Sequence, residues 1–170
     1  MQDVAKSESV TDPQRVPSDR AEGIMNKGES IQMALALAAQ LETEARQAQG
    51  DALALLSAIK TSRDVDALEK GGITTDCMET FGLGKAFGYI VNYAAAERPI
   101  PRDKVQKKFG VAIGERAGSV SAYTASIREA YHRRLGATVL RIYAERSSRG
   151  DDIGEIILDM RSQLNRVVGL

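Results

Sequence analysis

The sequence is poor in the residues that most often carry out chemistry. It has 170 residues, with one cysteine, one histidine and no tryptophan. The single Cys77 excludes a disulfide within the chain, and it lies 55 residues from His132, which is not the spacing of a zinc site. A lone histidine followed by two arginines does not suit a Ser-His-Asp triad, and the paired aspartates stand where helix caps are expected. We therefore predict a non-enzymatic protein with no metal and no cofactor.

Aromatic residues and long apolar runs are also scarce. Only 5% of the residues are Phe, Trp or Tyr, so the core must consist of alanine, leucine, isoleucine and valine, which suits closely packed helices. The apolar run Ala86–Ala96 has 11 residues, whereas a helix that crosses a bilayer needs about 20. The first residues contain no apolar segment typical of a secretory signal. These absences predict a cytoplasmic or virion-associated protein with no membrane partner and no evident small-molecule substrate.

Apolar residues at helical spacing predict an all-α fold, a helical bundle of about five to six helices with a flexible N-terminal arm. Residues 1–28 are polar, contain Pro13 and Pro17, and bury too little to offset the entropy of ordering. Residues 29–170 are predicted to form a single helical domain, and no strand-like alternation interrupts their pattern.

The first apolar stripe begins at Ser30. It indicates either one long helix to about Thr61 or two helices that meet near Gly50, and its constant phase favours one helix. The segment 77–96 is the most apolar, which predicts a central buried helix. Gly84 and Gly88 would there allow a neighbouring backbone to approach closely. Capping residues predict further helices over 62–70, over 104–109, over 119–147 and after Asp151-Asp152.

Charge is unevenly distributed along a chain whose net charge is zero. Residues 98–149, the basic block, hold 12 Lys and Arg against 4 Asp and Glu. Residues 1–97 hold 9 basic and 15 acidic residues. Arginine outnumbers lysine in the basic block, and its planar guanidinium suits phosphate and carboxylate groups. A concentrated basic segment is typical of a surface that meets phosphates or an acidic partner.

The basic block therefore predicts contact with a polyanion, most simply a nucleic acid bound without sequence preference. The predicted nucleic-acid-binding residues are Lys104, Lys107, Lys108, Arg116, Arg128, Arg133 and Arg134.

Residues 104–111 resemble the opening of a helix-turn-helix motif, in which a glycine turn separates a first helix from a recognition helix. Gln106 stands where that motif usually has a small residue, and Gly114 and Gly118 disfavour a helix directly after Val111.

A second hypothesis explains the charge pattern without nucleic acid. The acidic N-terminal part and the basic block can neutralise each other within one chain. They can also do so between copies, which would drive assembly of a capsid, shell or scaffold. The two hypotheses are compatible, and both predict a protein that associates with itself as a homo-oligomer.

Overall fold

The computed structural model describes residues 26–114 and 118–168, which form helices with no strand among them. This confirms the all-α prediction. The helices are α1 (Lys27–Arg46), α2 (Gln49–Ala58), α3 (Ser62–Lys70), α4 (Thr75–Glu79), α5 (Gly84–Ala95), α6 (Arg102–Phe109), α7 (Ser121–Arg149) and α8 (Ile153–Val168).

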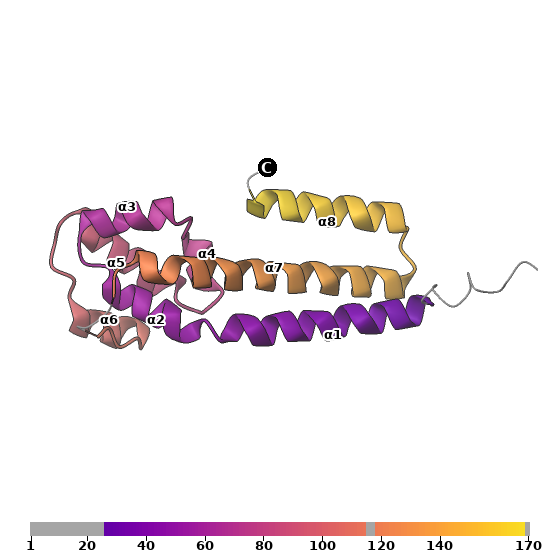
Figure 1. The fold of residues 1–170 in the computed structure, drawn as a ribbon, viewed down its shortest axis with the longest axis horizontal. Coiled ribbons are helices and arrows are strands. Elements are labelled where there is room, and N and C mark those ends of the chain that lie inside the picture. The colour runs from indigo at the N-terminus through magenta and orange to yellow at the C-terminus, as the bar shows by residue number, and fades with distance from the viewer. Residues whose placement is uncertain (1–25, 115–117, 169–170) are drawn as a thin grey trace, which may run out of the picture.

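Two parts of the molecule differ in architecture (Figure 1). Helices α2 to α6 gather around the first half of α7 and form what we call the core end. Its interior contains Leu55, Met78, Ile90 and Ile127, each with 0% of its surface exposed. The core end therefore holds most of the buried apolar surface that stabilises the fold.

In the other part, α1, the second half of α7 and α8 lie side by side (Figure 1). We call this the layer. Small residues bring α1 and α7 together, because Ala38 and Ala137 are fully buried and a Cβ on Gly136 would lie 3.4 Å from Leu41 Cδ1. Helix α8 covers the opposite side of α7 and has one fully buried large side chain, Ile156.

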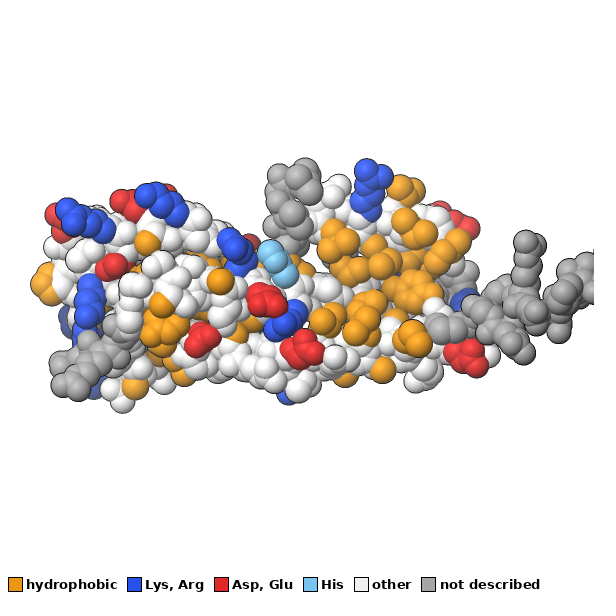
Figure 2. Space-filling model, viewed as in Figure 1, with side chains coloured by type: hydrophobic (Ala, Val, Ile, Leu, Met, Phe, Trp, Pro, Cys, Tyr) orange, Lys and Arg blue, Asp and Glu red, His pale blue; other side chains and the backbone are white. Residues whose placement is uncertain are grey.

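The two faces of the layer have different compositions. Residues three, four or seven apart share a face of a helix, and the hydrogen bond between the Ser30 and Tyr143 hydroxyls (2.7 Å) places both on one face of the layer. Figure 2 shows an apolar area over α8, α7 and α1 on this face. We define the apolar layer face as Leu37, Leu41, Leu140, Tyr143, Ile153, Ile157, Met160 and Leu164.

The favoured prediction of one long helix from Ser30 to Thr61 was wrong, and the alternative of two helices was right. The break falls at Gln47 and Ala48, whose amides donate to carbonyls three residues back, and Gly50 lies inside α2. Because of the break, Leu55 and its neighbours on α2 pack inside the core end. This tertiary packing therefore sets the direction of α2.

The central apolar helix predicted over 77–96 is also divided. Gly82 adopts a left-handed conformation with φ 71°, and the amide of Leu83 donates to the carbonyl of Met78 (3.0 Å), which ends α4. A Cβ on Gly84 would clash with a Glu79 side-chain oxygen and lie 3.1 Å from the Glu79 Cβ, so a close side chain, and not a neighbouring backbone, occupies the space beside this glycine. Gly88 has open space around it, so close packing does not explain it.

The remaining predicted helices are present. Thr61, and not Ser62, is the N-cap of α3, where it forms a capping box with Asp64. Asp152 accepts hydrogen bonds from the amides of Gly154 and Glu155 at the start of α8. Asn26 and Glu29 form the capping box of α1. The predicted N-terminal arm lies outside the described residues, apart from its last three.

Candidate nucleic-acid interface

The candidate site begins where α5 ends. The amide of Glu97 donates to the carbonyl of Ala94 (3.0 Å), and the amide of Arg98 donates to the carbonyl of Tyr93 (2.9 Å). These bonds form a Schellman motif, in which Glu97 takes the left-handed conformation (φ 54°) that usually belongs to glycine. The motif turns the chain and sets the Arg98 guanidinium carbon 4.8 Å from the centroid of the Tyr93 ring.

Two tyrosines one turn apart on α5 form the centre of the site. The ring centroids of Tyr89 and Tyr93 are 4.9 Å apart, and the Tyr89 hydroxyl donates to the Tyr93 hydroxyl (3.4 Å). Lys108 of α6 places its ammonium nitrogen 5.2 Å from the Tyr89 centroid. We call Tyr89, Tyr93, Arg98, Lys104 and Lys108 the cationic–aromatic cluster.

The electrostatics of Tyr93 reflect this arrangement. The hydrogen bond that Tyr89 donates lowers the pKa of the Tyr93 hydroxyl, and the positive charges of Arg98, Lys104 and Lys108 lower it further. Donating the same bond raises the pKa of Tyr89. The positive charges of Arg98, Lys104 and Lys108 therefore all lower the pKa of Tyr93. Arg98 lies just before Pro99–Pro101, which connects α5 to α6, and the two lysines belong to α6.

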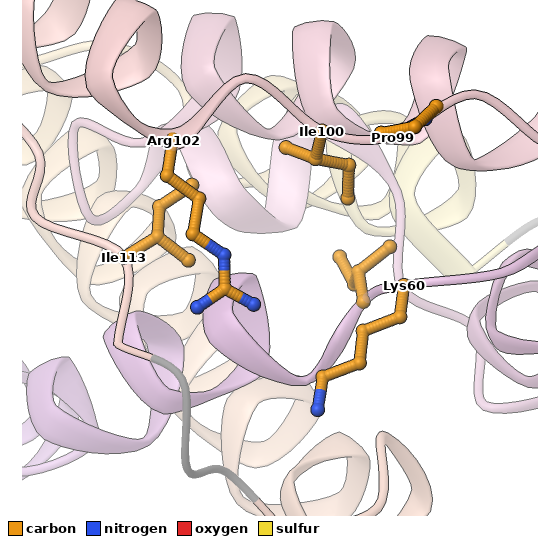
Figure 3. Close-up of a pocket in the computed structure, with 6 residues that line it drawn as sticks. Lys60, Pro99, Ile100, Arg102 and Ile113 are labelled. Atoms are coloured by element: carbon orange, nitrogen blue, oxygen red, sulfur yellow. The ribbon is translucent and has the colours of Figure 1, made fainter.

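A cavity of about 280 Å³ opens beside the cluster. Figure 3 shows Lys60 and Arg102 extending from opposite walls toward the same space. Isoleucines and proline complete the lining, which consists of Ile59, Lys60, Pro99, Ile100, Arg102 and Ile113. Arg102 also donates to the carbonyl of Gly114 (2.9 Å), which holds its guanidinium at the mouth of the cavity. The cavity thus combines an apolar wall with two cations.

A second hollow of about 220 Å³ connects this cavity with the cluster. It shares Lys60 and Pro99 with the cavity, and Thr61, Glu97 and Arg98 complete its lining. Because Arg98 also belongs to the cationic–aromatic cluster, one continuous path of cations leads from the cavity to the tyrosine pair. Such a path, with two half-buried tyrosines at one end, suits a chain of phosphates that carries planar groups.

The second half of the basic block has a different environment. Every ion pair found among the described residues involves an arginine of α7. The pairs are Arg133 with Glu44 and Glu129, Arg141 with Glu42, Arg146 with Asp151, Glu155 and Asp159, and Arg149 with Glu145. This part of the block is largely neutralised within the chain, whereas the cations of α6 and of the connector before it form no ion pair with any residue that the structure describes.

The predicted binding residues therefore separate into groups. Lys104 and Lys108 belong to the cluster, and Lys107 lies exposed on the same helix. The four predicted arginines do not belong to the cluster, and Arg116 is not among the described residues. Arg128 donates to the carbonyl of Gly71 (3.2 Å), and Arg133 is ion-paired. Arg134 lies over Phe81, with its guanidinium carbon 5.7 Å from the ring centroid.

Among the described residues, no helix lies between α6 and α7. Gly110 ends α6 in a left-handed conformation (φ 68°), and residues 111–114 have no regular secondary structure. Helix α7 begins at Ser121, and its first half packs in the core end through Ile127 and Ala130. The resemblance to a helix-turn-helix motif therefore does not extend to the arrangement in space.

A separate hollow of about 380 Å³ brings Cys77, His132, Arg128 and Tyr131 together. The buried Cys77 thiol lies 3.3 Å from the Thr74 hydroxyl and 3.8 Å from the carbonyl of Gly72, and it makes no hydrogen bond with His132. The described residues contain no group of three or more His, Cys, Asp or Glu that could hold a metal. Within the same residues, no helix is long and apolar enough to span a membrane.

Comparisons with protein families, curated proteins and solved structures found no match to this chain.

Sequence reasoning found the two lysines of the cluster but missed both tyrosines, Arg98 and Lys60. Tyr89 and Tyr93 are four residues apart, which places them on one helix face, so their pairing was readable from the sequence. The sequence did not predict that Lys60 and Arg102 line the same cavity, because this depends on how the loop after α2 packs against the Pro99–Pro101 connector.

Proposed function

We propose that this protein binds single-stranded nucleic acid, without sequence preference, at the cationic–aromatic cluster, and that it catalyses no reaction. The observation that carries the proposal is the tyrosine pair flanked by Arg98, Lys104 and Lys108. Bases of any identity can stack on aromatic rings, and lysine and arginine side chains attract the phosphates. The protein would act in the cytoplasm or in a virion.

The cavity and its adjoining hollow support the same proposal. They extend the path of cations beyond the tyrosines through Arg98, Lys60 and Arg102. A strand stacked on Tyr93 could continue along this path, where each phosphate would meet a cation. A single strand fits better than a duplex, because a duplex keeps its bases stacked on each other and leaves the tyrosines without a partner.

The charge-driven assembly hypothesis has less support. Its proposed contact, the acidic part of one copy against the basic block of the next, would require free charges on both. Arg133 and Arg141 instead pair with Glu44 and Glu42 of the same chain. Among the described residues, Arg128 and Arg134 of α7 form no ion pair either, but Arg128 donates to the carbonyl of Gly71 and Arg134 lies over the Phe81 ring. The other described cations of the block are those near α6, where nucleic acid is the partner that the tyrosines favour.

Fluorescence anisotropy with labelled oligo-dT and oligo-U of about 20 nucleotides tests the proposal. The logarithm of the binding constant should fall linearly with the logarithm of salt concentration, with a slope of about −0.7 per phosphate contacted. A duplex of equal length should bind more weakly. Absence of binding to either strand at about 50 mM salt would contradict the proposal.

A pair of matched variants tests the location. Lys104→Gln with Lys108→Gln removes two cations of the cluster and should reduce the steepness of the salt slope by about 1.4. Lys27→Gln with Lys85→Gln removes the same charge from exposed positions outside the cluster. Equal affinities for the two double variants would show that general charge, and not the cluster, governs binding.

A further inference from the structure

No helix among residues 26–114 and 118–168 covers the apolar layer face. On α8, Ile153 is 54% exposed and Ile157 is 57% exposed, while Leu37 on α1 is 43% exposed. These side chains line one side of α8 and α1, because Ile153 and Ile157 are one turn apart, and Leu37 follows Ser30 by seven residues. Figure 2 shows that the apolar area continues from one helix to the next.

The opposite face of the layer carries charges and needs no cover. Arg141 donates to both carboxylate oxygens of Glu42, and Arg149 pairs with Glu145 on the next turn of α7. The side chains of these ion pairs are partly exposed, so water solvates them without any further partner. Leu35 and Leu158 are also exposed but point away from the apolar layer face, so the layer is not apolar on one face alone. What distinguishes the apolar layer face is that its apolar side chains adjoin one another across three helices, and a contiguous area of this kind indicates that the face meets another apolar surface.

The size of the face points to an occupant built of helices. Three helices about 9 Å apart, over the 16 residues of α8, present an area on the order of 600 Å². This approaches the roughly 800 Å² that each partner buries in a stable protein–protein interface. Patches of this size are rarely left exposed on a monomer.

We propose that the occupant is a second copy of this chain, which packs its own apolar layer face against the first around a two-fold axis. An isologous contact places each apolar side chain against the same surface of its partner, and this face has the apolar composition and the area for it. The two layers together form a six-helix bundle, which buries side chains that one layer cannot. This inference is independent of the nucleic-acid proposal, because it uses neither the cluster nor the cavity.

The residues before Asn26 are the competing occupant. Their sequence contains six sizeable apolar side chains, Met1, Val4, Val10, Val16, Ile24 and Met25, spread among polar residues. The apolar layer face spans three helices and has eight apolar residues. The second copy therefore matches the face better in composition.

Sedimentation equilibrium of the full chain, from about 1 µM to about 100 µM, tests the proposal with two matched pairs of variants. The test variants are Leu37→Glu and Ile157→Glu. Their controls are Leu35→Glu and Leu158→Glu, which exchange equally exposed leucines for the same charge (41% and 67% exposed). Leu35 lies two residues from Leu37, and Leu158 lies two residues after the buried Ile156, so both controls point away from the face.

We expect a dimer whose dissociation constant rises at least about tenfold in each test variant and changes little in each control. Circular dichroism verifies that all four variants are folded. A wild-type chain that stays monomeric at about 100 µM would overturn the proposal. So would a dimer that all four variants weaken equally, or one that none of them weakens. A monomer that dimerises only after removal of residues 1–25 would assign the face to the chain's own N-terminal segment instead.

Discussion

The core end and the layer use isoleucine in different ways. In the core end, Ile90 and Ile127 have no exposed surface, because helices surround them on all sides. In the layer, Ile156 of α8 is buried, while Ile153 and Ile157 on the same helix are more than half exposed. The difference indicates that the core end contributes more than α8 does to the stability of the single chain.

The largest effect that separates the two parts is a change in the free energy of unfolding. Ile127→Ala should lower it by about 2–5 kcal/mol, because a fully buried side chain leaves a cavity. Ile157→Ala should lower the value for the monomer by less than about 0.5 kcal/mol, because that side chain is exposed. Urea denaturation at low protein concentration measures both. Similar losses in the two variants would show that the layer is as essential to the monomer as the core end.

The next effect is on binding at the core end. Tyr93→Ala should weaken binding of oligo-dT by about 5- to 150-fold, since a stacked base contributes about 1–3 kcal/mol. Tyr93→Phe keeps the ring and loses only the hydroxyl, so it should bind within about twofold of the wild type. Anisotropy titrations at one salt concentration compare them. If the alanine and phenylalanine variants bind alike, the ring does not contact a base.

A smaller effect concerns the turn that positions Arg98. Glu97 has a left-handed conformation, which glycine adopts freely and other residues adopt at a cost of about 1 kcal/mol. Glu97→Gly should therefore be more stable than Glu97→Ala by about that amount, since both lose the hydrogen bond that Ser62 donates to the carboxylate. Thermal unfolding of the two variants checks this, and a more stable alanine variant would argue against strain at this residue.

The smallest effect is in the layer and depends on pH. The hydrogen bond from Arg141 lowers the pKa of Glu42, and the charge of Arg141 adds to this effect. Because the folded value is lower than the unfolded value, the stabilisation is complete above the ordinary carboxylate pKa of about 4.3 and is lost as pH falls through the folded value. Glu42→Gln should therefore unfold at a slightly lower temperature than the wild type near neutral pH. The difference should vanish in acid, and a difference that grows there would contradict this role of Arg141.

Local signals in the sequence predicted most helices, because caps and apolar spacing act over a few residues. Asp152 at the start of α8 and Gly110 at the end of α6 are examples. The break at Gln47 and Ala48 had only a displaced signal, Gly50, which lies inside α2, and the apolar stripe keeps its phase across the break. The packing of α2 into the core end sets where the break falls.

The candidate site was predictable in part for the same reason. Lys104 and Lys108 stand out as charges in the sequence, whereas the counter-ions of Arg133 and Arg141 lie on α1, about 90 and 100 residues away. Sequence alone cannot tell a free arginine from one that a distant glutamate neutralises. The sequence therefore predicts one basic surface. In the described residues the fold divides it into cations near α6 that form no ion pair and a stretch of α7 in which four arginines are paired with carboxylates.

Photo-crosslinking with mass spectrometry tests the central claim most directly. A single strand that carries 4-thiouridine is bound to the full-length protein, irradiated and mapped to the residues that it modifies. The account predicts crosslinks at Tyr89 and Tyr93 and in the tryptic peptides that contain Lys104 and Lys108. Crosslinks confined to the second half of α7 or to α8 would contradict it.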